Sequence, residues 1–85
     1  MTVHELKTWP GQFRDVAAGR KTFEVRRDDR GFAVGDRLVL REWDLPEERY
    51  TGRQLTVRVS HLLRGGEFGI DADFVVMSVV RDGAL

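Results

Sequence analysis

Hydrophobic and polar residues alternate along most of this chain, and the alternation predicts five short strands. Residues 54–63 form the longest alternating run, with Leu55, Val57, Val59 and His61 on one face, so we expect His61 to pack in the core. Residues 74–80 are almost continuously apolar, which is typical of a strand buried on both faces. The remaining strands are predicted at residues 3–8, 22–27 and 37–43.

The strand predicted at residues 22–27 alternates strictly. Phe23 and Val25 fall on one side of it, and Thr22, Glu24 and Arg26 fall on the other. This pattern is typical of a half-buried strand with an apolar face toward the core and a second face that carries charge.

One helix is predicted at residues 10–18, between the first two strands. Pro10 suits the first helical position, Phe13, Val16 and Ala17 recur at helical spacing, and Gly19 follows where a left-handed cap is needed. Five strands would leave open sheet edges that promote aggregation, and closure into a barrel removes them. The sequence therefore predicts an α+β, mostly β fold: a small, mostly antiparallel barrel with one helix packed on it.

Composition narrows the possible functions. The 85 residues fit a single domain spanning residues 1–85. The chain has no cysteine and only two histidines, so neither a metal site nor a cofactor is expected. Basic and acidic side chains, 14 of each, cancel, which argues against a globally basic nucleic-acid binder. Because we find neither a membrane-spanning run nor a signal-peptide pattern, we expect a cytoplasmic protein without membrane contact.

Lys21, Glu24 and Arg26 form the candidate site. Period-two spacing places Glu24 and Arg26 on one strand face with Thr22 beside them, and Lys21 lies at the end of the preceding turn. Lysine and arginine can hold phosphate, and the carboxylate can accept a hydrogen bond from the amino group of a base. The further candidates are Lys7, His4, Arg27 and Arg30 beside this cluster, Trp9 and Trp43 for base stacking, and Asp29 to orient an arginine.

The same residues allow other interpretations. The charged cluster also fits a solvated strand face that contributes little to stability. His4 or His61 with Lys21 would supply the acid–base pair of a ribonuclease. The acidic run 42–48 is interpreted as a solvated loop in which Trp43 packs inward, with docking of a basic protein as the alternative.

The spacing Gly19-x-Lys21-x-x-Glu24-x-Arg26 resembles the G-x-K-x-x-E-x-R signature of ASCH domains, which belong to the PUA-like superfamily. The chain also resembles DUF3850, a small ASCH-like family, over nearly its whole length. The further matching segments are His4-x-Leu6-Lys7, Phe13, Asp29-Arg30-x-Phe32, Gly35-Asp36, Leu40-x-Glu42, residues 50–53 and residues 75–79. The resemblance implies a PUA-like barrel of five or six strands, with a helix between the first two strands. It also implies a ligand site at the barrel mouth, near Lys21, Glu24 and Arg26, for RNA or a modified nucleoside.

Some ASCH-like proteins are amidohydrolases that deacetylate N4-acetylcytidine. Lys21 matches their motif lysine, but Glu24 occupies the position of their threonine nucleophile. Thr22 lies on the same strand face and would act from a position displaced by roughly 6–7 Å. We therefore expect a noncatalytic domain that binds RNA or a nucleotide-like small molecule; in the enzymatic alternative, Lys21, Glu24 and Thr22 would carry the reaction.

Overall fold

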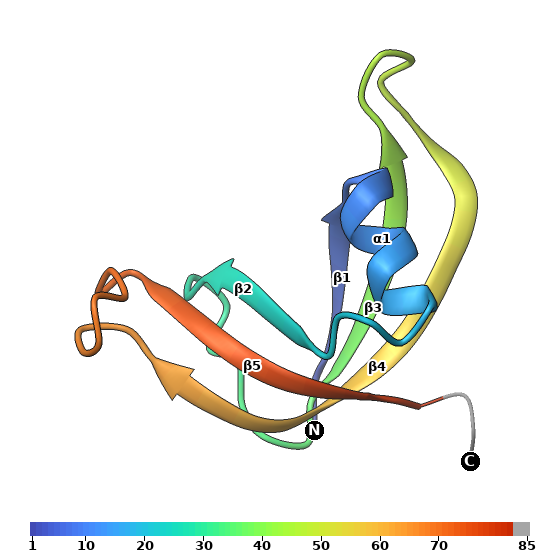
Figure 1. Ribbon diagram of the computed structural model, residues 1–85. Helices are drawn as coiled ribbons and strands as arrows, with labels where there is room; N and C mark the ends of the chain where they lie inside the picture. The colour runs from blue at the N-terminus through green and yellow to red at the C-terminus, as the bar shows by residue number, and fades with distance from the viewer. Residues whose placement is uncertain (83–85) are drawn as a thin grey trace.

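The computed structural model describes residues 1–82, which form one curved five-stranded sheet and one helix (Figure 1). The elements are β1 (Val3–Thr8), α1 (Pro10–Ala17), β2 (Phe23–Arg27), β3 (Arg37–Asp44), β4 (Arg49–Arg64) and β5 (Phe74–Arg81). The helix begins at Pro10, whose missing N–H costs nothing at that position, and Gly19 follows it with a φ of 80°. The predicted small, mostly β fold with one helix between the first two strands is confirmed.

The strand order explains the shape of the sheet. It runs β1-β3-β4-β5-β2, with β1 parallel to β3 and every other neighbouring pair antiparallel. The long strand β4 pairs with β3 along its first part and with β5 along its second, so it spans both arms of the bend in Figure 1. The result is a half-barrel in which β1 and β2 lie at the two open edges.

The core lies on the concave side of this half-barrel. The strand predicted at residues 3–8 is present as β1, and His4, Leu6 and Thr8 are buried on one face of it. Helix α1 contributes Phe13 and Val16 to the same core. The buried apolar residues are Leu6, Phe13, Val16, Phe32, Leu38, Leu40, Leu55, Val57, Val59, Val75, Met77 and Val79.

The structure corrects three predictions about the later strands. His61 is exposed, because a register shift between Val59 and His61 interrupts the alternation that would have turned it inward. β5 is buried on one face only, since Ser78 and Val80 are exposed. β4 is also longer than the run predicted at residues 54–63, because it begins at Arg49 and ends at Arg64.

The faces of β2 are reversed relative to the prediction. Phe23 and Val25 are 46% and 48% exposed, whereas Glu24 is only 2% exposed. The charged face of this strand therefore points into the concave side of the sheet. This reversal creates the polar wall of the pocket described next.

Candidate ligand-binding pocket

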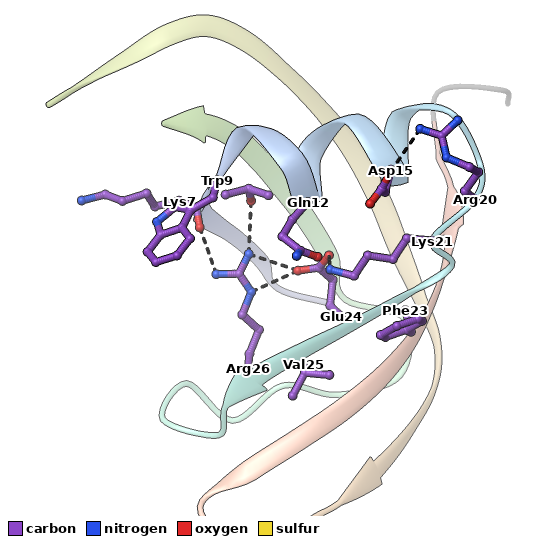
Figure 2. A pocket seen from close by; sticks show the side chains of 11 residues that line it. Lys7, Trp9, Gln12, Asp15, Arg20, Lys21, Phe23, Glu24, Val25 and Arg26 are labelled. Carbon is purple, nitrogen blue, oxygen red and sulfur yellow. Dashed lines mark hydrogen bonds and ion pairs between the residues drawn. The ribbon is translucent and has the colours of Figure 1, made fainter. Parts of the chain in front are cut away.

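A pocket of about 650 Å³ lies between the end of β1, one side of α1 and the strand β2 (Figure 2). Its lining residues are Lys7, Thr8, Trp9, Gln12, Asp15, Arg20, Lys21, Phe23, Glu24, Val25 and Arg26. Four of these side chains are basic and two are acidic, in a chain whose formal net charge is 0. The pocket therefore concentrates positive charge locally.

Glu24 is the buried centre of the pocket wall. Its Oε2 atom accepts a hydrogen bond from Lys21 Nζ at 3.3 Å, and its Oε1 atom accepts one from Arg26 Nε at 3.1 Å. Arg26 Nη2 also lies 3.1 Å from Oε1. The predicted convergence of these three side chains is thus present, and two cations compensate the cost of burying the carboxylate.

Arg26 fixes the wall to the opposite edge of the sheet. Its Nη1 atom donates to the main-chain oxygen of Lys7 at 3.0 Å, and its Nη2 atom donates to Thr8 Oγ1 at 3.1 Å. With the bond to Glu24, most of its five N–H groups are engaged within the protein. Arg26 therefore positions Glu24 and joins β2 to β1.

Lys21 and Arg20 enter the pocket from the turn that follows α1. The main-chain N–H groups of both residues donate to the carbonyl oxygen of Asp15, which fixes the turn, and Arg20 Nη2 contacts Asp15 Oδ1 at 3.1 Å. The Lys21 side chain is 15% exposed, and among residues 1–82 it makes one hydrogen bond, to Glu24. Because an ammonium group has three N–H donors, two remain for a ligand.

Trp9 supplies an aromatic surface to the pocket. It precedes the first residue of α1 in an extended conformation, and it is 61% exposed. Its side chain is among those that line the pocket (Figure 2). A planar aromatic group held open to solvent beside a cationic pocket can stack on a base.

Sequence reasoning missed part of the pocket lining. Gln12 and Asp15 line the pocket but are not among the candidates from the sequence, although their i, i+3 spacing places them on one face of the helix. Phe23 and Val25 were assigned to the core. No local signal shows that this helix face and strand β2 border one space, because their relation depends on long-range strand order.

The structure places His4 away from the pocket. Its Nε2 atom lies 2.9 Å from Asp36 Oδ2, both side chains are buried, and its ring packs 4.7 Å from that of Phe32. Burial raises the pKa of Asp36, but the hydrogen bond with His4 and those from the main-chain N–H groups of Thr2 and Ala33 outweigh burial. Together they hold the pKa of this carboxyl below its ordinary value of 3.8. His4 is thus a structural residue that joins β1 to the loop before β3.

The other basic candidates divide between the rim and more distant positions. Lys7 lines the pocket, and its Nζ atom also lies 3.9 Å from the centre of the Trp43 ring, outside the lining. Arg27 contacts Asp73 at 3.8 Å and does not line the pocket. Arg30 donates to the main-chain oxygen of Glu5 at 3.0 Å and does not line the pocket. Asp29 lies 3.9 Å from Arg30, with both side chains exposed, so it does not orient an arginine of the pocket.

The acidic run 42–48 begins within β3, at a residue that is not solvated. Glu42 is buried, and its Oε1 atom accepts a hydrogen bond from Thr51 Oγ1 at 2.8 Å. Trp43 packs edge-on against Tyr50 with ring centres 4.9 Å apart. The expectation of a fully solvated acidic loop is therefore wrong at Glu42, while the tip residues Glu47 and Glu48 are exposed.

Of the residues named for the enzymatic alternatives, Lys21 and Glu24 lie together in the pocket, whereas the threonine and the two histidines do not join them there. Thr22 is exposed and does not line the main pocket; it borders a second, smaller cavity of about 210 Å³ that also includes Lys21. His61 is exposed on β4, and His4 is engaged by Asp36. Within residues 1–82, no three histidine or acidic side chains are placed to hold a metal ion together.

In the described part of the chain, no helix is long and apolar enough to cross a membrane.

Comparison with known proteins identifies the family of this chain. The chain is 36% identical over 58 residues to an uncharacterized 12.9 kDa protein in the GpA 3′ region of Escherichia phage P2. The alignment covers 68% of this chain and 51% of the phage protein, so it spans about half of that relative. The family model described as a domain of unknown function, DUF3850, matches residues 3–79, and the chain therefore belongs to the DUF3850 family.

Proposed function

We propose that this domain binds RNA or a nucleotide-like ligand in the pocket between β1, α1 and β2, without catalysing a reaction on it. The observation that carries the proposal is the buried Glu24 carboxylate, held between Lys21 and Arg26 in a pocket that also contains the exposed ring of Trp9. These groups offer the three contacts that a nucleotide needs: a cation, a polar group for the base edge and an aromatic plane.

Lys21 is the main anion contact in this proposal. Its two unused N–H donors can bind phosphate, and Lys7 and Arg20 extend the positive charge along the lining. Arg26 has fewer donors left, because it already contacts Glu24, Lys7 and Thr8. Arg26 adds to the positive electrostatic potential of the pocket, and it holds Glu24 in position.

Glu24 discriminates between ligands rather than adding general affinity. Its Oε1 atom is contacted by two nitrogen atoms of Arg26, whereas its Oε2 atom accepts one hydrogen bond, from Lys21, and keeps a lone pair that can accept another from the amino group of a base. A ligand that brought a second acceptor to this position would leave buried groups unpaired, at a cost of about 1–3 kcal/mol. We therefore assign Glu24 to base selection.

The architecture supports the same proposal at the level of the fold. The curved sheet with a helix after its first strand, together with the spacing of Lys21, Glu24 and Arg26, resembles the ASCH domains of the PUA-like superfamily. That resemblance implies binding of RNA or modified nucleosides. The site geometry carries the argument, and the fold analogy is consistent with it.

The test is a titration of labelled single-stranded oligoribonucleotides of each base, followed by fluorescence anisotropy. The Lys21→Ala variant should bind about tenfold more weakly or worse, because a charge-assisted hydrogen bond contributes about 1.5–3 kcal/mol. Arg14→Ala is the matched control, since Arg14 is exposed on α1, is absent from the lining, and its loss changes the net charge equally.

Two results would count against the proposal. Equal losses of affinity in Lys21→Ala and Arg14→Ala would mean that binding depends only on net charge, and the pocket would then not be the binding site. Chromatographic detection of N4-acetylcytidine turnover that disappears in Lys21→Ala would show an enzyme instead of a binder.

A further inference from the structure

The main-chain N–H and C=O groups of successive residues in β2 point alternately toward β5 and toward the open edge of the sheet. The N–H of Val79 donates to the oxygen of Thr22 at 3.0 Å, and the N–H of Asp28 donates to the oxygen of Asp73 at 2.7 Å. The even-numbered residues of β2 therefore direct their N–H and C=O groups toward β5. Phe23 and Val25 direct theirs the other way, toward the open edge of the sheet.

The main-chain groups of β1 alternate in direction in the same way, but those at its open edge already have hydrogen-bond partners. The N–H of Arg37 donates to Thr2 oxygen, so the carbonyl groups of Glu5 and Lys7 point to the open side of β1. Each accepts a hydrogen bond of 3.0 Å, from Arg30 and from Arg26 respectively. The arginine side chains thus satisfy the carbonyl groups of this edge.

The edge of β2 has no such partners. Among residues 1–82, neither a side chain nor a loop N–H contacts the main-chain groups of Phe23 and Val25, and β2 pairs with β5 alone. Both residues line the pocket, and both are about half exposed. The pocket therefore contains a main-chain donor and acceptor that are free for a ligand.

We propose that the open edge of β2, through the main-chain N–H and C=O of Val25, reads the hydrogen-bonding edge of an unpaired nucleobase. This inference rests on the proposed nucleotide-binding function and specifies the base contact. Every nucleobase carries a donor and an acceptor side by side on its Watson–Crick edge, and an amino-acid residue at a strand edge offers the complementary pair. A phosphate group carries only acceptors, so Lys21 is suited to phosphate and Val25 to the base.

The open edge of β2 is poorly suited to a peptide ligand that would pair with it as an additional strand. Strand addition requires a continuous open edge, whereas the Arg26 side chain crosses from β2 to Lys7 and Thr8 and interrupts the space. What remains open is the short stretch at Phe23 and Val25, in a pocket of about 650 Å³. That volume lies within the range of about 300–1,000 Å³ that is usual for small-ligand sites.

Amide hydrogen exchange tests the proposal in the unmodified protein. In the free protein, the N–H of Val25 should exchange much faster than that of Glu24, which faces β5 and serves as an internal control. Addition of the best-binding single-stranded oligoribonucleotide should slow exchange at Val25 by tenfold or more, with little change at Glu24. An unchanged rate at Val25 under saturation would overturn the proposal.

Two further comparisons separate the base contact from binding as such. Methylation of the Watson–Crick edge of each base in the same oligomer should weaken binding at least tenfold. Val25→Pro removes the edge N–H at a position where an edge strand tolerates proline. It should bind at least tenfold more weakly than Val25→Ala, which also lacks the valine side chain but keeps the N–H.

The outcomes distinguish this proposal from the one on which it rests. Failure of every oligomer to bind contradicts the proposed function itself. Binding that depends on Lys21 but ignores base methylation and leaves the Val25 N–H unprotected contradicts only the base contact. If Val25→Pro fails to fold, the exchange and methylation results decide.

Discussion

Arg26 on β2 donates a hydrogen bond to the main-chain oxygen of Lys7 on β1 at 3.0 Å, across the opening of the half-barrel. These strands lie at opposite ends of the sheet order and share no main-chain pairing. The contact therefore connects the two edges of the sheet through a side chain. Because the same guanidinium also holds Glu24, the closure of the half-barrel and the geometry of the pocket depend on one residue.

Arg26→Ala should lower the free energy of unfolding by about 2 kcal/mol or more, because it leaves the buried Glu24 carboxylate with a single cationic partner. Urea denaturation followed by circular dichroism measures the change. Arg27→Ala is the matched control: Arg27 is the next residue, is largely exposed, and should cost no more than about 0.5 kcal/mol. Equal effects of the two substitutions would show that Arg26 has no special structural role.

Lys21 and Glu24 should be energetically coupled. In a double-mutant cycle with Lys21→Ala and Glu24→Gln, we expect a coupling free energy of about 1 kcal/mol, since both groups are shielded from solvent and 3.3 Å apart. Thermal or urea unfolding of the four proteins provides the values. Additive effects of the two substitutions would mean that the ion pair contributes nothing beyond its separate parts.

The buried contact between His4 and Asp36 predicts a specific loss of stability in acid. The folded protein holds the pKa of Asp36 below its ordinary value of 3.8, so ionised Asp36 stabilises the fold at pH values above 3.8. This contribution is lost as the pH falls through the lower pKa of the folded state. Urea unfolding free energies of the wild-type protein should therefore decline more steeply below about pH 4 than those of Asp36→Asn.

The control for this pH dependence is Asp29→Asn, which removes an exposed carboxylate that makes only a long contact with Arg30. In this variant, the free energy of unfolding should decline with falling pH as steeply as in the wild-type protein. An Asp36→Asn variant with the wild-type slope would show that other groups dominate the acid response.

Two glycines should respond oppositely to alanine. A Cβ atom on Gly65 would overlap the main-chain carbonyl groups of Asp71 and Phe74, so Gly65→Ala should cost about 2–3 kcal/mol. Gly11 lies in α1 with open space around it, and Gly11→Ala should raise stability by about 0.5–1 kcal/mol. Unfolding midpoints of both variants test the prediction, and destabilisation by Gly11→Ala would contradict the helix position assigned to it.

The sequence pattern predicts the elements of this fold well because each strand and the helix carry a local signal. Pro10 and Gly19 mark the helix, and the alternation in residues 3–8 correctly turns Leu6 inward. A β-bulge has no such signal, since one extra residue reverses the side-chain direction without changing the hydrophobic pattern. The incorrect placement of His61 in the core follows from this limit.

The reversal of β2 has a different physical origin. Hydrophobicity alone favours burial of Phe23 and Val25, but the concave side next to this strand is polar, because Lys21 and Arg26 together pair with Glu24 there. The spacing of these three residues predicted that they converge. It did not show that they converge inward, since the partners from β1 become visible only once the strand order is known.

Trp9 should contribute to ligand binding but not to stability. Its ring is 61% exposed, so Trp9→Ala should change the free energy of unfolding by no more than about 0.5 kcal/mol. If a base stacks on this ring, the same substitution should weaken oligoribonucleotide binding about tenfold, because a base–aromatic stack contributes about 1–3 kcal/mol. Anisotropy titrations measure the binding change.

Trp43→Phe provides the control, because Trp43 lies outside the pocket lining and this variant should keep normal affinity. Equal affinity losses at both tryptophans would exclude a specific stacking role for Trp9, whereas a loss confined to Trp9 would place a base at the entrance of this pocket.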